Sequence, residues 1–300
     1  MKSNQENMLL YLEETYITVS FIDDNKKVSI VKSKQDEKLY VCKRLSIYDE
    51  AVYRALQKHP VDGTPAIYDI VGNDDEMIII EEYIDGTRLD TYIENIHEKM
   101  EDGQLERELV SIIMQLCDIL TKLHGMNPPI IHRDIKPQNI YVKDSNVYLI
   151  DFNISRQYTG RESRDTYIMG TEDFAAPEQY GFLESDVRTD IYGLGATVKN
   201  ILSTPCLESG KLSTFADIAS SFNPDRRFKS ADDARKYLEF RYDLRQGMHR
   251  YALPGFRSRN NYKSLVALLY YIGTFLALFF TPGMSEEAGV MRYIENGIDN

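Results

Sequence analysis

The sequence predicts an α+β fold in which strands come first, helices follow, and one long apolar helix lies near the C-terminus. Short runs rich in β-branched and aromatic residues, separated by polar turns, dominate the chain as far as Gly86. Beyond Gly86 apolar residues mostly recur at spacings of three and four, which is typical of helices. The 18 residues from Ser264 to Thr281 contain no charged side chain.

The strand-rich part begins with three runs that we interpret as an antiparallel meander. They are TYITVSFI, KVSIV and LYVCKRL, and the polar pieces DDNK and KSKQDE separate them. A helix is expected around Tyr48 to Lys58. The runs AIYDIV and MIIIEEYI then predict two more strands.

The middle of the chain is mainly helical. Glu106 to His124 carries apolar residues around the whole circumference of a helix, which predicts a helix buried inside a domain. Met114, Cys117 and His124 in it are interpreted as packing residues. The run NVYLIDFNI predicts another strand, and helices are expected again from Asp173 to about Tyr242.

The C-terminal residues differ in composition from the rest. Residues 241–263 form a basic linker, and Ser264 to Thr281 is long enough to cross a hydrocarbon core. Cations precede this stretch and mostly acids follow it, so the positive-inside rule places the N-terminal domain in the cytoplasm. We therefore expect a single-pass protein of the cell membrane, with residues 282–300 as a short extracytoplasmic tail. The alternative is a buried core helix.

Charge and cysteine content exclude several functions. The formal net charge of −12 and the pI of about 5.0 give no basic surface for nucleic acid, so no nucleic-acid partner is expected. Cys42, Cys117 and Cys206 lie far apart and form no CxxC pair, which predicts neither a zinc site nor a disulfide framework. The N-terminus has one cation before a short apolar run broken by glutamates, unlike a signal peptide.

Four motifs carry polar residues at close spacing. In chain order they are HRDIKPQN from His132, IDFN from Ile150, GTEDFAAPE from Gly170 and TDIYGLG from Thr189. Their order and spacing resemble the eukaryotic-type protein kinase family. The resemblance covers roughly Thr15 to Phe240, and PEQYGF and RTDIYGLG look most like membrane-anchored serine/threonine kinases of bacteria. It implies a bilobal protein kinase fold in residues 12–240, with an N-lobe of about 12–84 and a C-lobe of about 85–240.

The resemblance also implies ATP and Mg²⁺ as cofactors and assigns roles to the motif residues. Asp134 would accept or orient the proton of the substrate hydroxyl, and Lys136 would lie near the transferring phosphoryl group. Asn139 and Asp151 would ligate Mg²⁺. The lysine of DIKPQN resembles the serine/threonine branch of the family rather than the tyrosine branch.

Lys43 in LYVCKRL is the residue that the resemblance places on the α- and β-phosphates of ATP. It shares a strand face with Val41 and Leu45, which predicts an inward-pointing stem. The family needs an acid on the following helix to hold this lysine. The distance from Pro60 favours Glu50 for that role, whereas the apolar spacing of the helix would suit Asp49 better, and we expect Glu50 because its side chain reaches farther.

Two departures from the family bear on nucleotide binding. The loop that covers the phosphates is usually GxGxxG, but this chain has FIDDNKKV there and no glycine before Gly63. Asp, Asn and Lys keep a backbone farther from phosphates than glycine does. The usual DFG is DFN, with Asn153 as a residue that tolerates positive φ. Glu82 and Tyr83 are expected to bind adenine through their backbone, whereas Glu81, unusual at its position, is left outside the predicted site.

Further expectations concern architecture and partners. Glu178 should pair with Arg227 in a buried ion pair, and Asp190 should cap the backbone of the catalytic loop. Thr159, Ser163 and Thr166 are candidate phosphorylation sites, and Thr171 should shape the substrate site. The resemblance implies a protein substrate, and a homodimer would allow autophosphorylation.

The function predicted from these residues is an ATP-dependent serine/threonine protein kinase tethered to the membrane. The alternative is a pseudokinase scaffold or signalling module with weak or no nucleotide turnover, which the missing glycines and DFN favour. A small-molecule phosphotransferase fits less well, because GTEDFAAPE resembles the segment that docks protein substrates.

Overall fold

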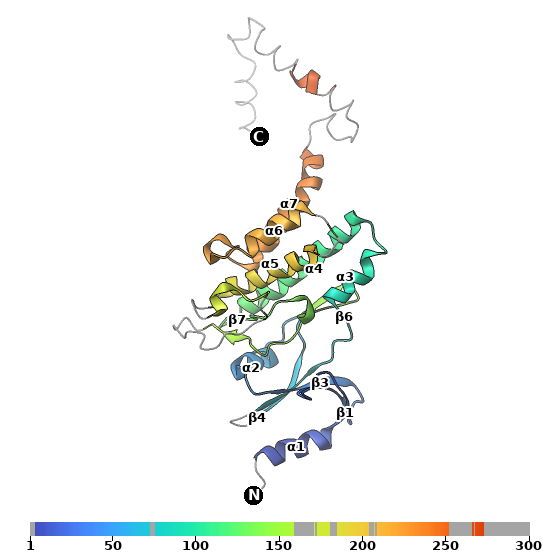
Figure 1. The fold of residues 1–300 in the computed structure, drawn as a ribbon, viewed down its shortest axis with the longest axis vertical. Coiled ribbons are helices and arrows are strands. Elements are labelled where there is room, and N and C mark those ends of the chain that lie inside the picture. The colour runs from blue at the N-terminus through green and yellow to red at the C-terminus, as the bar shows by residue number, and fades with distance from the viewer. Residues whose placement is uncertain are drawn as a thin grey trace, which may run out of the picture. The chain divides into compact units, whose positions relative to one another are not determined.

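A computed structural model describes residues 4–72, 76–158, 171, 173–180, 185–203, 207, 209–251, 266 and 268–272. The chain divides into two compact units, Met1–Glu239 and Phe240–Asn300. The first unit contains a sheet-rich lobe and a helical lobe that follow each other in the sequence (Figure 1). The α+β class and the two lobes predicted from the sequence are therefore confirmed.

The N-lobe is built on a five-stranded antiparallel sheet with the strand order β1-β2-β3-β5-β4. Its elements are α1 (Asn4–Thr15), β1 (Tyr16–Phe21), β2 (Val28–Ser33), β3 (Leu39–Leu45), α2 (Glu50–Lys58), β4 (Ile67–Gly72) and β5 (Met77–Glu82). The MIII run forms β5, which pairs with β3 and with β4, and its four side chains are at most 1% exposed. A strand with both faces covered needs such a continuous apolar run.

Helix α1 precedes the sheet and was not expected from the sequence. Its Leu12 packs into the cluster of buried side chains that includes Ile78 and Ile80. Near its C-terminal end the hydroxyls of Tyr11 and Tyr16 donate to Asp69 Oδ2 at 2.8 and 3.0 Å. The helix therefore covers the face of β5 on which Ile78 and Ile80 lie.

The C-lobe is mainly helical and carries two small sheets, β6-β8-β9 and β10-β7. Its elements are β6 (Thr87–Arg88), α3 (Leu89–His97), α4 (Asp102–His124), β7 (Ile130–Ile131), η1 (Pro137–Asn139), β8 (Ile140–Lys143), β9 (Asn146–Leu149), β10 (Arg156–Gln157), η2 (Pro177–Tyr180), α5 (Val187–Ser203), α6 (Gly210–Ala219), η3 (Pro224–Arg226) and α7 (Ala231–Tyr251). Helix α4 buries apolar side chains from Leu105 to Leu123, but Arg107, Ser111, Asp118 and Lys122 are exposed, so this helix is not buried around its whole circumference as the sequence predicted.

A buried ion pair fastens η2 to the C-lobe, as the sequence predicted. The guanidinium of Arg227 donates to both carboxylate oxygens of Glu178, at 2.6 and 2.9 Å. The remaining donors of Arg227 reach backbone carbonyls, among them those of Arg188 and Ser221, and Thr189 donates to Glu178 Oε1. Both charged groups are thus hydrogen-bonded beyond their mutual contact, which offsets the cost of removing them from water.

The second unit is described only in part. None of the helices in the described part of the chain is both long enough and apolar enough to cross a membrane. Of the stretch Ser264 to Thr281, only Val266 and residues 268–272 are described, and they are helical. Most of the predicted transmembrane helix, most of the basic linker and the whole of the tail 282–300 lie outside the described residues, and these segments stay predictions.

The buried pair predicts a large loss of stability when one charge is removed. Glu178→Gln should lower the free energy of unfolding by about 3–5 kcal/mol, because Arg227 then stays buried without a counter-charge. Lys236→Gln is the control, because Lys236 pairs with Asp232 on an exposed helix surface. It should leave the urea midpoint almost unchanged. Equal midpoints for the two variants would contradict a special role for the Glu178–Arg227 pair.

Candidate active site

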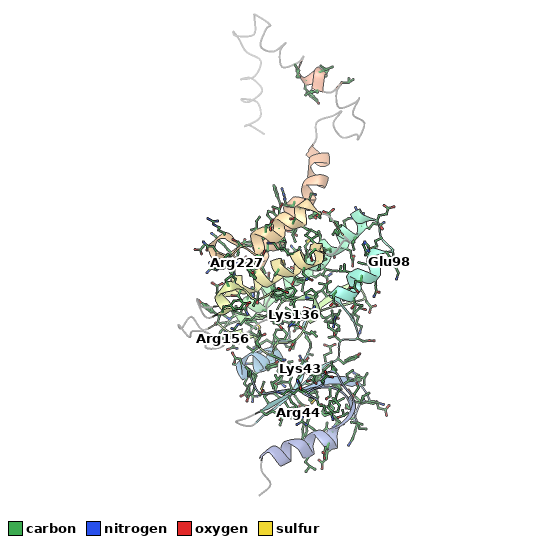
Figure 2. All side chains as sticks on the ribbon, in the orientation of Figure 1. Lys43, Arg44, Glu98, Lys136, Arg156 and Arg227 are labelled. Atoms are coloured by element: carbon green, nitrogen blue, oxygen red, sulfur yellow. The ribbon has the colours of Figure 1, made fainter. Side chains whose placement is uncertain are left out.

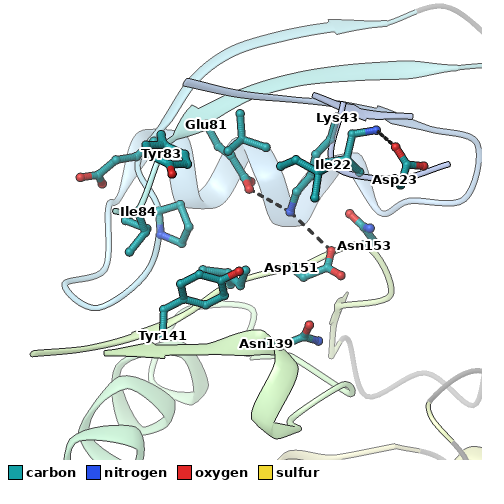
Figure 3. A pocket seen from close by; sticks show the side chains of 15 residues that line it. Ile22, Asp23, Lys43, Glu81, Tyr83, Ile84, Asn139, Tyr141, Asp151 and Asn153 are labelled. Atoms are coloured by element: carbon teal, nitrogen blue, oxygen red, sulfur yellow. Dashed lines mark hydrogen bonds and ion pairs between the residues drawn. The ribbon is translucent and has the colours of Figure 1, made fainter. Parts of the chain in front are cut away.

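A pocket lies between the sheet of the N-lobe and the hairpin β8–β9 of the C-lobe (Figure 3). Its walls come from β2, β3, β5 and the segments around η1 and β9. The lining residues are Ile22, Asp23, Val28, Val41, Lys43, Pro65, Glu81, Glu82, Tyr83, Ile84, Asn139, Tyr141, Ile150, Asp151 and Asn153. The apolar part of this lining would accept a flat base, and the charged part lies at the end where Lys43 and Asp151 approach each other.

The HRD segment between β7 and η1 is fixed by Asp190 of α5. The backbone N–H groups of His132 and Arg133 donate to the two oxygens of Asp190, at 2.8 and 2.7 Å. His124 Nε2 lies 2.8 Å from the same carboxylate. Burial alone would raise the pKa of Asp190, but hydrogen bonds from His124 and the backbone lower it. The predicted capping role of Asp190 is thus confirmed by these contacts.

Three predicted residues meet at Asp134. Lys136 Nζ lies 2.7 Å from Asp134 Oδ2, and Asn139 Nδ2 donates to the same oxygen at 2.8 Å. The hydroxyl of Thr171 donates to Oδ1 at 3.1 Å and accepts a hydrogen bond from Lys136 at 2.8 Å. The carboxylate is therefore held from both sides. Such an arrangement fixes the direction in which Asp134 can accept a further proton.

Asp151 faces Lys43 across the cleft, with Oδ1 3.4 Å from Nζ. Burial alone would raise the pKa of Asp151, but Lys43 and, to a smaller extent, His132 lower it, so the carboxylate stays ionised. Asn139 turns its amino group toward Asp134, which leaves its carbonyl oxygen directed elsewhere in the pocket. One carboxylate and one amide oxygen in the same pocket are ligands that suit Mg²⁺ when phosphates complete its shell.

The partner of Lys43 is Glu81, not the predicted Glu50. Lys43 Nζ lies 2.8 Å from Glu81 Oε1, and both side chains are buried. In the register of β3 and β5, Val41 is opposite Glu81 and Lys43 is opposite Ile79. Lys43 and Glu81 are therefore diagonal neighbours on one face of the sheet, within reach of long side chains. The sequence did contain a sign of this contact: Glu81 lies two and four residues after Ile79 and Met77, so all three side chains point to the same face of β5.

Glu50 and Asp49, the two acids considered as partners of Lys43, make other contacts, so the prediction of Glu50 is wrong. Glu50 is the first residue of the helix, and its half-exposed side chain pairs with Arg54 one turn later. Asp49 caps the helix by accepting from the backbone N–H of Ala51 at 3.0 Å. Its other oxygen accepts from the backbone N–H of Gln157 at 3.1 Å. The number of residues back from Pro60 identified Glu50 as the position where the family has its acid, but it gave no information on the direction in which the Glu50 side chain points.

The charges around Lys43 explain its protonation. Burial alone would lower the pKa of Lys43, but Glu81 and Asp151 outweigh it and raise the pKa above its usual value. Burial also raises the pKa of Glu81, which Lys43 counteracts. The two carboxylates thus share one ammonium group.

Glu82 and Tyr83 both line the pocket, as the resemblance implied. The backbone N–H of Glu82 already donates to the carbonyl of Ala66 at 2.8 Å. The Glu82 carboxylate accepts from the N–H of Ala66 in return, at 3.2 Å. Adenine recognition by this segment stays a prediction, and it cannot use the Glu82 N–H.

The glycine-free loop between β1 and β2 closes by its own hydrogen bonds. Asp23 accepts from the backbone N–H groups of Val28 and Lys27, at 2.7 and 3.2 Å, and these bonds lower the pKa of its carboxyl. Lys26 adopts a φ of 56°, which glycine would adopt without strain. Asp23 therefore directs a negative charge to the pocket and occupies backbone donors of the loop.

The DFN segment departs from the expected backbone. The positive φ of 70° lies at Asp151 and not at Asn153. Asn153 instead accepts a hydrogen bond from the hydroxyl of the fully buried Tyr53, at 3.0 Å. The asparagine is explained by this contact with α2 rather than by a left-handed conformation. The candidate phosphorylation sites Thr159, Ser163 and Thr166 lie outside the described residues.

Comparison with known proteins agrees with this architecture. A family model described as "Protein kinase domain" matches residues 19–237. The chain therefore belongs to the eukaryotic-type, or Hanks-type, protein kinase family. It is similar to a probable serine/threonine-protein kinase of Dictyostelium discoideum, with 29% identity over 215 residues that cover 62% of this chain and 19% of the relative.

Two bacterial relatives show similar identity. Serine/threonine-protein kinase PknB of Mycolicibacterium smegmatis is 33% identical over 163 residues, which cover 51% of this chain and 24% of the relative. Serine/threonine-protein kinase D of Synechocystis is 32% identical over 142 residues, which cover 45% of this chain and 26% of the relative. The matched part of the chain thus spans about a fifth to a quarter of the length of these relatives.

The loop contacts predict how one charge affects nucleotide binding. Asp23→Asn should lower the Kd of Mg-ATP about three- to tenfold, because it removes a negative charge near the phosphates but keeps an oxygen acceptor for the loop. Calorimetric titration of both proteins measures the change. Asp24→Asn is the matched control, because Asp24 is exposed. If Asp23→Asn binds no tighter than Asp24→Asn, this loop does not approach the phosphates.

Proposed function

We propose that the protein is an ATP- and Mg²⁺-dependent serine/threonine protein kinase that transfers the γ-phosphoryl group to protein hydroxyls. The observation that carries the proposal is the convergence of Lys136, Asn139 and Thr171 on Asp134, next to a pocket that contains Lys43 and Asp151. The names of the relatives and the lysine of DIKPQN support the serine/threonine class.

The proposed mechanism assigns one task to each residue. Asp134, held by three hydrogen bonds, orients the substrate hydroxyl and accepts its proton. Lys136 neutralises charge that develops on the transferring phosphoryl group. Lys43 binds the phosphates, and the oxygens of Asp151 and Asn139 would hold Mg²⁺. The metal would supply charge neutralisation along the triphosphate.

The alternative is a pseudokinase scaffold, and one observation favours it. Asp23 places a carboxylate in the pocket and occupies loop donors that could otherwise face phosphates. The complete set Lys43, Asp134, Asn139 and Asp151 favours an active enzyme, because a scaffold has no need for the positioned base. Autophosphorylation between two copies of the chain belongs to the same proposal.

Substitution of Asp134 and substitution of Asp151 should each lower kinase activity, but for different reasons. Asp134→Asn should lower kcat by at least about a hundredfold, the usual size of a general-base contribution, while the Kd of Mg-ATP stays near wild type. Asp151→Asn should also weaken Mg-ATP binding, because it removes a proposed metal ligand. Transfer of labelled phosphate and calorimetry measure the two quantities.

Asp62→Asn is the control for both variants. Its side chain is 97% exposed and pairs with Lys122 on the surface, so it should behave like wild type. Turnover at the wild-type rate in both Asp134→Asn and Asp151→Asn would refute the assignment. A wild-type chain that binds Mg-ATP without turnover would identify the scaffold.

We further propose that residues 264–281 anchor the protein in the cell membrane, with the kinase domain in the cytoplasm. The support is the uncharged stretch itself and the basic residues before it. In its described part, Val266, Leu268, Leu269, Tyr270 and Ile272 are between 46% and 66% exposed. Apolar side chains with this exposure are expected on a helix that lies in lipid rather than in a protein core.

The anchoring proposal predicts how the chain fractionates. Full-length protein should sediment with membranes and resist extraction by high salt, because apolar burial does not depend on ionic strength. A chain shortened to end at Tyr242 should stay in the supernatant. Freely soluble full-length protein without detergent would show that the stretch is a core helix.

A further inference from the structure

Lys43 takes its counter-charge from the sheet, although the family takes it from the helix after β3. The acids at the start of α2 cannot reach the ammonium group while they cap the helix and pair with Arg54. Glu81 Oε1 lies 2.8 Å from Nζ. Glu81 on β5 therefore takes the role that an acid on the helix has in the family.

The location of Glu81 makes this substitute rigid. Strand β5 pairs with β3 along six residues and with β4 along most of its length. Glu81 is 3% exposed, and Lys43 is 5% exposed. A contact between two neighbouring strands keeps its geometry as long as the sheet persists, whereas a contact to a helix changes whenever that helix rotates or shifts.

Helix α2 is tied instead to the segment that follows Asp151. Tyr53 donates to Asn153 Oδ1 at 3.0 Å. Asp49 accepts from the Gln157 backbone N–H, and the Gln157 side chain donates to the carbonyl of Ala51 at 3.2 Å. These contacts connect α2 to residues 153–157.

We propose that Glu81 is the positioning residue for Lys43, in the place that an acid of helix α2 would otherwise take. The proposal rests on the proposed nucleotide-binding role of the pocket. Glu81 contacts the lysine and not the reacting atoms, so it acts through Lys43. Helix α2 makes its hydrogen bonds to Asn153 and Gln157, and neither of its first acids contacts the lysine.

Nucleotide binding gives the first test, on the full-length chain in detergent. Glu81→Gln keeps the shape of the side chain but removes its charge, so Lys43 loses its nearest partner. The Kd of Mg-ATP should rise about tenfold, the effect of losing one charge-assisted hydrogen bond. Glu81→Asp should recover part of the affinity. Glu50→Gln is the matched control and should bind like wild type, because Glu50 contacts Arg54.

The rate of Lys43 acylation gives a readout that needs no turnover. Glu81 Oε1 holds the ammonium group at 2.8 Å, so removing this carboxylate breaks the ion pair and leaves the amine freer to react. Acetic anhydride labelling of Lys43, followed by mass spectrometry, should therefore be faster in Glu81→Gln than in wild type at pH 8. Labelling in Glu50→Gln should match wild type, because Glu50 pairs with Arg54.

The outcomes separate this inference from the proposed function. If the chain binds Mg-ATP but does not transfer phosphate, the kinase proposal fails and the labelling result still decides the role of Glu81. Unchanged labelling and binding in Glu81→Gln, or an equal effect of Glu50→Gln, would overturn the inference. If Glu81→Gln does not fold, Glu81→Asp decides: faster labelling than wild type supports the pairing, and wild-type labelling contradicts it.

Discussion

The geometry of the cleft depends on the buried ammonium group of Lys43. An unpaired charge inside a protein costs several kcal/mol, so the surroundings of this lysine must supply carboxylates. Glu81 supplies one from the same sheet, and Asp151 supplies another from the C-lobe. Because the two acids belong to different lobes, the ammonium group connects them. Figure 2 shows Lys43 on the sheet side of this boundary and Lys136 on the helical side.

The C-lobe meets the same electrostatic requirement with hydrogen bonds. Asp190 is fully buried, and backbone N–H groups and His124 stabilise its charge. It holds the chain before Asp134 in a conformation that includes a φ of 70° at Arg133. A left-handed residue of this kind costs about 1–3 kcal/mol, which the surrounding contacts offset. The result is a carboxylate that is already oriented before any substrate arrives.

The C-lobe residues that the sequence singled out meet in the structure because they are close in the chain. Asp134, Lys136 and Asn139 lie within six positions, so one loop brings them together. The partner of Lys43 was predicted wrongly. It depends on the register of β3 and β5 and on the orientation of α2, and the number of residues between Glu50 and Pro60 gives no information on either. Helix α1 was missed for a related reason, since Leu12 is buried only against a sheet whose residues come later in the sequence.

A glutamate of β5 holds the lysine that we propose to bind the phosphates. The most direct measurement is a crystal structure of the protein with Mg²⁺ and a non-hydrolysable ATP analogue. The account predicts that Lys43 Nζ keeps its contact with Glu81 Oε1 and also reaches phosphate oxygens, while Glu50 stays on Arg54. A structure in which Glu81 has left the lysine, and Glu50 or Asp49 has replaced it, would contradict the account.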